Sequence, residues 1–156
     1  MKIFEATTPE HIDIARALFR EYQQFLNVDL CFQGFEEELA SLPGKYAPPN
    51  GAILLAEVAQ DIAGCVAVRE LKDGTCEMKR LYVKDKFRGL AIGKQLAKAI
   101  VAQAKALQYQ KMQLDTLERL ETAMGIYQKL GFKKTSPYYA NPLDEVVYWE
   151  LDLTAS

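Results

Sequence analysis

The stretch with the clearest chemical pattern is LYVKDKFRGLAIGKQLAKAI, residues 81–100. It reads as a strand that ends at Val83, a short basic turn that contains Gly89, and a helix that begins near Ala91. The first N–H groups of a helix have no partner within the helix, and the positive end of the helix dipole lies beside them. This order of elements therefore predicts a site for an anion such as a phosphate. Positive charge around the turn comes from Lys84, Lys86, Arg88 and Lys94.

Two common phosphate-binding motifs do not match this turn. A Walker loop has four residues between its glycines and then Lys and Ser or Thr, whereas three residues separate Gly89 from Gly93 and Lys-Gln follows. A dinucleotide fingerprint, G-x-G-x-x-G, is absent. What remains is Arg88-x-x-Ala91-x-Gly93. The alternative interpretation is a glycine turn between a strand and an amphipathic helix, with basic side chains that are only solvated.

A second pattern, ETAMGIYQKLGF, occupies residues 121–132. Together the two patterns resemble the signature motifs of the GNAT superfamily of acetyl-CoA-dependent N-acyltransferases, Q/R-x-x-G-x-G/A followed by A-x-x-[FLI]-Y-x-K-x-GF. One position departs from the family pattern, because Ala91 stands where glycine is usual, although its N–H stays available. The two motifs are independent and occur in the family's order, and the resemblance covers essentially the whole chain.

The resemblance implies acetyl-CoA as cosubstrate and no metal. In the superfamily, the strand before the turn and the next strand splay apart, and the pantetheine arm of the cofactor enters between them. The backbone after Val83 is then expected to bind the pyrophosphate, and the backbone of the preceding strand to bind the pantetheine arm and to polarise the thioester carbonyl. The cofactor-binding residues that this implies are Leu81, Tyr82, Val83, Arg88, Gly89, Ala91, Ile92, Gly93, Lys94 and Lys129.

The resemblance also implies catalytic roles for Tyr127 and Glu77. Tyr127 holds the position whose phenol, in many members, protonates the departing CoA thiolate; a phenol of pKa about 10 is able to donate to a thiolate whose thiol has a pKa of about 8.5. Glu77 lies six residues before Val83, where some members place a glutamate base that takes a proton from the amine. The alternatives are packing within the helix for Tyr127, and pairing with a neighbour such as Lys79 for Glu77.

Charge and one loop bear on the acceptor, which is expected to be a primary amine of a small molecule or peptide. Residues 1–78 carry 6 basic and 13 acidic side chains, three of them glutamates at 36–38, whereas residues 79–98 carry 7 and 1. The N-terminal helices of the superfamily often border the acceptor pocket, so this acidic half favours a cationic amine. Tyr138 and Tyr139, in the loop PYYANPLD, are predicted to line the acceptor channel.

The elements that must position these residues are strands and helices along one chain. In strand 75–83, alternation predicts one face with Cys76, Met78, Arg80 and Tyr82, and the other with Glu77, Lys79, Leu81 and Val83. Apolar runs and alternation predict strands at 2–6, 52–58, 62–68, 75–83, 111–117 and 147–153. Helical spacing predicts helices at 9–25, 35–42, 91–108 and 120–130, the last of them stopped by Gly131.

These elements predict a mixed α/β fold in a single domain over residues 1–156. By resemblance it is a GNAT-like, mixed but mostly antiparallel, twisted sheet of about six to seven strands, flanked by about four helices.

Composition excludes several other classes of protein. The chain has 156 residues, 49% of them hydrophobic, and a net charge of −2, which argues against disorder and against a dedicated nucleic-acid binder. No apolar run is long enough for a membrane span and no secretory signal is evident, so a cytoplasmic location is expected. Cys31, Cys65 and Cys76 form no close pair and His11 is the only histidine, so neither a metal site nor a His-dependent nucleophile is expected.

Two other classes of function stay open from the residues alone. One is a non-catalytic acyl-CoA-binding regulatory module that kept the cofactor site, and the other is an interaction domain without a cofactor. A homodimer is also left open.

Overall fold

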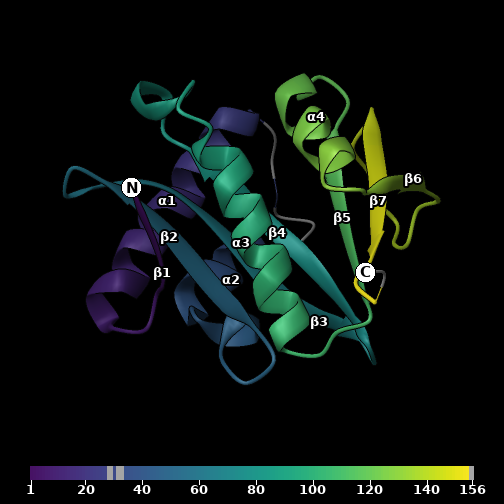
Figure 1. Cartoon of the computed structure of the whole chain (residues 1–156), viewed down its shortest axis with the longest axis horizontal. Coiled ribbons are helices and arrows are strands. Elements are labelled where there is room, and N and C mark those ends of the chain that lie inside the picture. Colours follow the sequence, from purple (N-terminus) through teal and green to yellow (C-terminus); the bar gives the residue numbers. More distant parts are fainter. Residues whose placement is uncertain (28–29, 31–33, 155–156) are drawn as a thin grey trace.

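Seven strands form one sheet in the order β1-β2-β3-β4-β5-β7-β6 (Figure 1). The computed structural model describes residues 1–27, 30 and 34–154. Neighbouring strands in this part of the chain are antiparallel, except that β4 and β5 run parallel. The strands are β1 (Lys2–Glu5), β2 (Ala52–Val58), β3 (Asp61–Lys72), β4 (Thr75–Val83), β5 (Lys111–Leu117), β6 (Lys133–Thr135) and β7 (Val146–Asp152).

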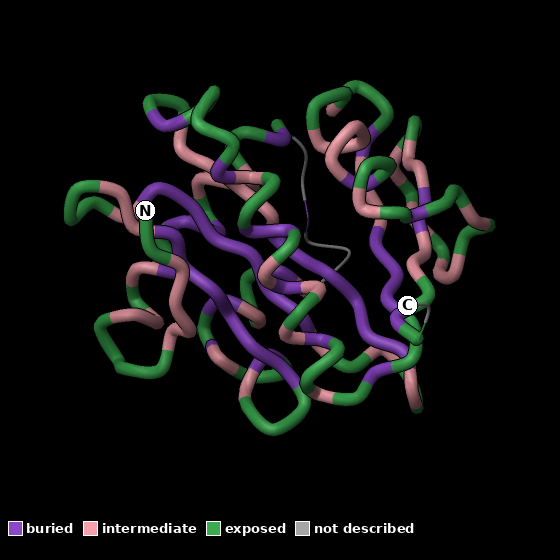
Figure 2. The backbone as a smooth tube through the Cα atoms, in the orientation of Figure 1, coloured by how far each residue is buried: buried purple, intermediate pink, exposed green. Residues whose placement is uncertain are grey.

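Helices cover both faces of the sheet (Figures 1 and 2). One apolar core lies between the sheet and α3 and α4, and a second lies between the sheet and α1 and α2. The described helices are α1 (Pro9–Leu26), α2 (Phe35–Ser41), α3 (Ile92–Ala106) and α4 (Glu121–Lys129), with 3-10 turns η2 (Gly44–Tyr46) and η3 (Asp85–Phe87). The described part of the chain therefore confirms the predicted mostly antiparallel sheet with four helices, and adds the short strand β6, which the sequence analysis did not predict.

Local sequence signals explain where the helices begin and end. The Thr8 hydroxyl accepts a hydrogen bond from the N–H of His11 at 3.1 Å, and Pro9 occupies the first turn of α1. Asn27 ends α1 in a left-handed conformation, with φ 55°. Gly131 follows α4 with φ +99°, so the predicted stop is confirmed.

The β4 and β5 strands pair only at their first residues. Thr75, Cys76 and Glu77 lie opposite Lys111, Met112 and Gln113, and no pair follows in the described residues. Beyond Glu77 the two strands separate, while β5 keeps its full pairing with β7. The sheet therefore opens between its two halves at the C-terminal ends of β4 and β5.

A bulge interrupts the alternation that was predicted for β4. Ala67 of β3 lies opposite Lys79 and Cys65 lies opposite Tyr82, so β4 contains one extra residue here, and Arg80 has a φ of 62°. The extra residue reverses the side on which later side chains point. The predicted face with Cys76, Met78, Arg80 and Tyr82 is wrong: Cys76 and Met78 share the α3 side with Leu81 and Val83, whereas Arg80 and Tyr82 contact α1 and α2.

Candidate active site

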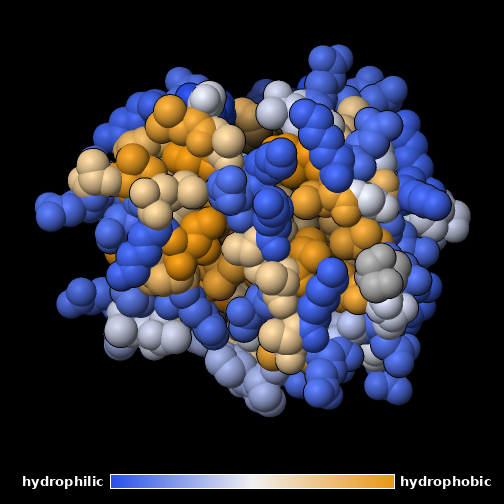
Figure 3. Space-filling view, in the orientation of Figure 1, coloured by the Kyte–Doolittle hydropathy of each residue, from blue (hydrophilic) through white to orange (hydrophobic). Residues whose placement is uncertain are grey.

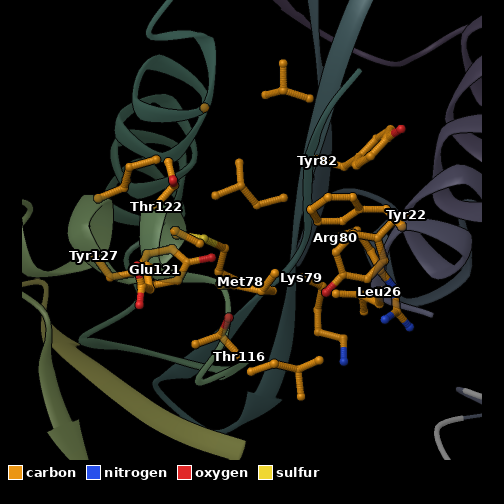
Figure 4. A pocket seen from close by; sticks show the side chains of 18 of the residues that line it. Tyr22, Leu26, Met78, Lys79, Arg80, Tyr82, Thr116, Glu121, Thr122 and Tyr127 are labelled. Carbon is orange, nitrogen blue, oxygen red and sulfur yellow. The ribbon is translucent and has the colours of Figure 1, made fainter. Parts of the chain in front are cut away.

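A cavity of about 790 Å³ lies where β4 and β5 separate. This volume is in the range of small-molecule and cofactor sites. Its walls come from α1, β4, the turn before α3, β5, α4 and the loop of residues 136–145. Figure 4 shows Tyr22 and Leu26 on the α1 side, Thr122 and Tyr127 on the α4 side, and Met78 between them. Figure 3 shows apolar side chains gathered between α3 and α4.

The predicted anion-binding turn forms one end of the cavity. Gly89 has φ +88° and Ala91, the residue before α3, has φ 59°, so both lie in the left-handed region. The N–H groups of the first turn of α3 face this end and have no helical partner by geometry. Arg88 donates from Nε to the Val83 carbonyl at 3.1 Å and pairs with Asp85 at 3.0 Å, which fixes the turn against the end of β4.

Nine of the ten predicted cofactor residues line this cavity. Lys129 is the exception, because it is exposed on α4 and lies outside the lining. Lys84 and Lys86 also lie outside it, where they pair with Glu21 and Asp61 at 3.8 and 3.9 Å. The nine lining residues are Leu81, Tyr82, Val83, Arg88, Gly89, Ala91, Ile92, Gly93 and Lys94.

Tyr127 projects from α4 into the cavity lining and is 5% exposed. Its ring lies 5.7 Å from the ring of Phe132 and 6.4 Å from that of Trp149, measured between centroids. Burial, supplemented by the charge of Asp115, raises the pKa of the Tyr127 phenol well above its ordinary value. The phenol therefore stays protonated at neutral pH. Tyr127 both packs against neighbouring rings and lines the cavity.

Glu77 lies outside the cavity lining, and other side chains engage both of its carboxylate oxygens. Oε1 accepts from Arg69 Nε at 3.0 Å and Nη2 at 2.9 Å, and Oε2 accepts from the Tyr138 hydroxyl at 2.6 Å. Burial pushes the pKa of Glu77 up, but the positive charges of Lys79 and Arg69 and the Tyr138 hydrogen bond bring it below its ordinary value. This arrangement suits a structural anion better than a base that meets substrate.

Tyr138 and Tyr139 do not line the cavity, but their hydroxyls bind carboxylates next to it. Tyr138 donates to Glu77, and the Tyr139 hydroxyl donates to Asp115 Oδ2. Their rings lie 5.4 Å apart and both contact the ring of Tyr148 edge-on. Asn141 and Leu143, in the same loop, do line the cavity.

Sequence reasoning missed several polar residues of the cavity, among them Tyr22 on α1, Lys79 on β4 and Asp115 on β5. Lys79 is 6% exposed, and burial, with Arg80 nearby, lowers its pKa to about 8. The available signal was a charged residue next to an apolar one in each of two strands, Lys79 beside Met78 and Asp115 beside Leu114. Burial of such a residue is costly, which makes it a candidate for function.

The acidic run at 36–38 does not reach the cavity lining. Glu38 pairs with Arg80 at 3.0 Å, and the more exposed Glu36 pairs with Arg20 at 3.4 Å. The cationic acceptor inferred from this run therefore has no contact here to support it.

Cys65 and Cys76 are buried free thiols, and Cys31 lies outside the described residues. Within the described ranges, no cluster of three or more His, Cys, Asp or Glu side chains is arranged to hold a metal ion. None of the described helices is both long and apolar enough to cross a bilayer.

Comparison with known proteins gives consistent relatives. Residues 49–134 match the model of the acetyltransferase (GNAT) domain family. An uncharacterized N-acetyltransferase of Schizosaccharomyces pombe is 44% identical over 148 residues, which cover 94% of this chain and 91% of that protein. An uncharacterized N-acetyltransferase of Dictyostelium discoideum is 34% identical over an alignment of 215 residues, which covers 98% of this chain and 99% of that protein.

Solved structures share the fold at lower identity. A GNAT-family acetyltransferase from Staphylococcus aureus matches with a TM-score of 0.79 and 20% identity, over 98% of this chain and 99% of that one. A Salmonella typhimurium protein solved with its cofactor acetyl-CoA matches with a TM-score of 0.76 and 14% identity, over 100% and 95%.

Proposed function

Because the chain belongs to the GNAT family of acetyltransferases, we propose that it moves the acetyl group of acetyl-CoA to a primary amine of a small molecule or peptide by direct attack while both substrates are bound. The single observation that carries this proposal is the cavity at the opening between β4 and β5. It joins an anion-binding turn on the α3 side to a mixed apolar and polar pocket on the α1 side. Two substrates entering from opposite faces of the sheet would therefore meet in one space.

The residues around the turn fit the phosphate-rich end of acetyl-CoA. Gly89 has open space where a side chain would be, so a phosphate is able to approach the backbone closely. Arg88 and Lys94 add positive charge to the lining beside the N–H groups of α3. Beyond the last pair with β5, the backbone of Leu81 to Val83 has no paired strand on that side in the described residues. The amide groups of an extended pantetheine arm would find hydrogen-bond partners there.

Acetyl-CoA supplies a thioester whose carbonyl carbon accepts the amine nitrogen. We assign to Tyr127, which lines the cavity, the role of giving a proton, or a strong hydrogen bond, to the sulfur that leaves. Its raised pKa keeps the phenol protonated until negative charge develops beside it. A buried donor held by Phe132 and Trp149 needs little reorganisation to act.

The acceptor half of the cavity favours an amine that carries an apolar group. Its wall combines a group of apolar side chains with polar ones, among them Tyr22, Lys79 and Asp115, that could fix the orientation of an acceptor. The apolar side chains of this half are Phe25, Leu26, Leu30, Leu117, Leu143 and Val146. An amine with an aryl or branched alkyl substituent would bury its apolar surface here, whereas a polyamine would leave this wall unsatisfied.

An acceptor screen tests the function directly. Purified protein is incubated with acetyl-CoA and aralkylamines, amino acid amides, polyamines or peptides, and free CoA thiol is measured. We expect turnover that is fastest with apolar amines. Micromolar acetyl-CoA binding by calorimetry without acetyl transfer to any amine would instead favour a non-catalytic acyl-CoA-binding module.

Tyr127→Phe tests the role of the phenol. Loss of the hydroxyl should lower kcat by roughly 100-fold, the usual scale for a general acid, and should leave acetyl-CoA affinity nearly unchanged. The matched control is Tyr109→Phe, which removes a hydroxyl that donates to the Asn50 carbonyl outside the cavity. Equal kcat values for the two variants would show that Tyr127 only packs.

A further inference from the structure

We propose that Asp115, and not Glu77, is the carboxylate that receives the acceptor amine and takes its proton. This inference rests on the proposed acetyl transfer and names a catalytic residue for it. Asp115 is the carboxylate of β5 that lines the cavity, whereas Glu77 lies outside the lining.

Asp115 lies where the sheet opens. It is two residues beyond Gln113, which is the last residue of β5 paired with β4, and opposite Tyr148 of β7. By strand alternation it points to the α1 side of the sheet, because Met112 and Leu114 belong to the α3 core and Leu117 to the α1 core. The carboxylate is therefore at the mouth of the passage that joins the two faces.

The loop of residues 136–145 holds this carboxylate through one oxygen. Oδ2 accepts from the Tyr139 hydroxyl and from Asn141 Nδ2 at 3.2 Å, and Asn141 also donates to the Tyr139 oxygen at 2.8 Å. Among the described residues no hydrogen bond reaches Oδ1. The two bonds orient the carboxylate and leave its second oxygen for a ligand in the cavity.

The charges around Asp115 bear on whether an acceptor amine is able to bind there as an ammonium ion. Glu77 is already matched by Arg69 and Tyr138, and Arg80 by Glu38. Lys79, on the same face, is buried with Glu77 and Asp115 as its negative neighbours, and its pKa of about 8 leaves it mostly charged at pH 7. An ammonium group at Oδ1 would lower that pKa further and displace the Lys79 proton, so one cation would still face Asp115.

The proton balance of the reaction follows from these positions. The amine arrives as an ammonium ion and gives one proton to Asp115, which frees the nitrogen lone pair. The nitrogen–carbon bond forms, the carbon–sulfur bond breaks, the nitrogen loses a second proton to water, and Tyr127 gives a proton to sulfur. Exchange with water then restores Asp115 and Tyr127. Ammonium and thioester become amide, thiol and one released proton.

Two acceptors with different amine pKa values test this role. Phenethylamine is an alkyl amine of pKa about 10, and leucine amide has an α-amine of pKa about 8. Asp115→Asn should lower kcat/KM for phenethylamine at pH 7 by roughly 100-fold. The loss should be smaller for leucine amide, and smaller for both acceptors as the pH approaches the amine pKa, because the nitrogen then arrives neutral.

The controls separate this role from a structural one. Glu118→Gln removes a carboxylate from an exposed residue three positions away and should retain wild-type rates at every pH. Tyr139→Phe keeps the Asp115 carboxylate but loosens its support, so a loss of roughly 10-fold with the same pH dependence is expected. Acetyl-CoA affinity by calorimetry should be unchanged in all three variants.

Two results would overturn the proposal: wild-type rates in Asp115→Asn, or a loss that is the same for both acceptors and at every pH. Turnover by the wild-type protein tests the acetyl transfer itself, and the ratio of variant to wild type tests Asp115, so the two ideas fail separately.

Discussion

Replacing Glu38 with glutamine probes the ion pair that anchors the bulge of β4. Glu38 accepts from Arg80 Nη2 and Nε, both at 3.0 Å, in a two-pronged contact between α2 and the sheet. Arg80 is 3% exposed, and its guanidinium also lies over the ring of Phe35 at 4.9 Å. Glu38→Gln keeps the side-chain shape and removes the charge, so Arg80 loses the carboxylate that compensates its burial.

Breaking a buried ion pair from one side costs about 3–5 kcal/mol. Glutamine still offers one oxygen to Arg80, so we expect the lower end, a loss of about 3 kcal/mol in the free energy of unfolding. For a protein of this size that is a fall in Tm of about 6–12 °C. The matched control is Glu36→Gln on the same helix, because Glu36 and Arg20 have side chains that are 61% and 52% exposed. That change should cost below about 1 kcal/mol.

Urea denaturation of both variants beside the wild type measures the difference. Equal losses in Glu38→Gln and Glu36→Gln would refute the reasoning, because burial of Arg80 would then not decide the cost. The same two variants also test whether the acidic run at 36–38 attracts a cationic acceptor. Both remove one negative charge from the acidic run, but only Glu38 compensates Arg80 of the cavity lining, so a shared effect on cationic amines that weakens with salt would indicate the run as a whole.

Two further predictions concern the turn and the buried lysine. Ala91→Gly removes a methyl group from a residue in the left-handed conformation, which relieves about 1–2 kcal/mol of strain in the folded state. The added freedom of glycine stabilises the unfolded chain by about 0.4–1 kcal/mol. We therefore expect the free energy of unfolding, measured by thermal unfolding, to rise by about 0.5–1 kcal/mol, and a fall would contradict this. The pKa of Lys79 falls from 10.5 to about 8 on folding, so between those values the unfolded chain binds more protons and stability rises with pH. Lys79→Met should lack that rise between pH 8 and pH 10 in urea titrations, and equal slopes would show that Lys79 does not cause it.

The elements with strong patterns were predictable from the sequence. The spacing of apolar residues in α1 and α3 and the turn at 88–93 were predictable, because helix periodicity and helix termini are local properties, and the turn does line one end of the cavity. Anion binding at this turn stays a prediction. The three-residue strand β6 was not predictable in this way, since it is too short to show alternation.

The errors at the site arise from long-range structure. Alternation in β4 was extrapolated through Arg80, but the bulge there depends on pairing with β3 and leaves no signal in a single strand. Asp115 was passed over because the resemblance implied that the two strands separate, but which β5 side chains face the opening depends on where pairing with β4 ends. The acidic run at 36–38 was assigned to the acceptor from net charge, yet Glu38 is engaged by Arg80, a residue distant in sequence.

In the described part of the chain, three residue pairs between β4 and β5 join the two halves of the sheet. The first half, β1 to β4, carries Lys79 and Arg80. The second half, β5 to β7, carries Asp115 on β5 and Tyr127 on α4, the helix between β5 and β6. These pairs at Thr75–Glu77, which form the seam of the sheet, therefore set the relative orientation of the two halves. They lie far from the predicted cofactor-binding turn. A small change of tilt at this seam would move the proposed proton donor, Tyr127, and the proposed proton acceptor, Asp115, relative to the bulged strand. Residues outside the cavity lining would then affect the geometry of the proposed reaction.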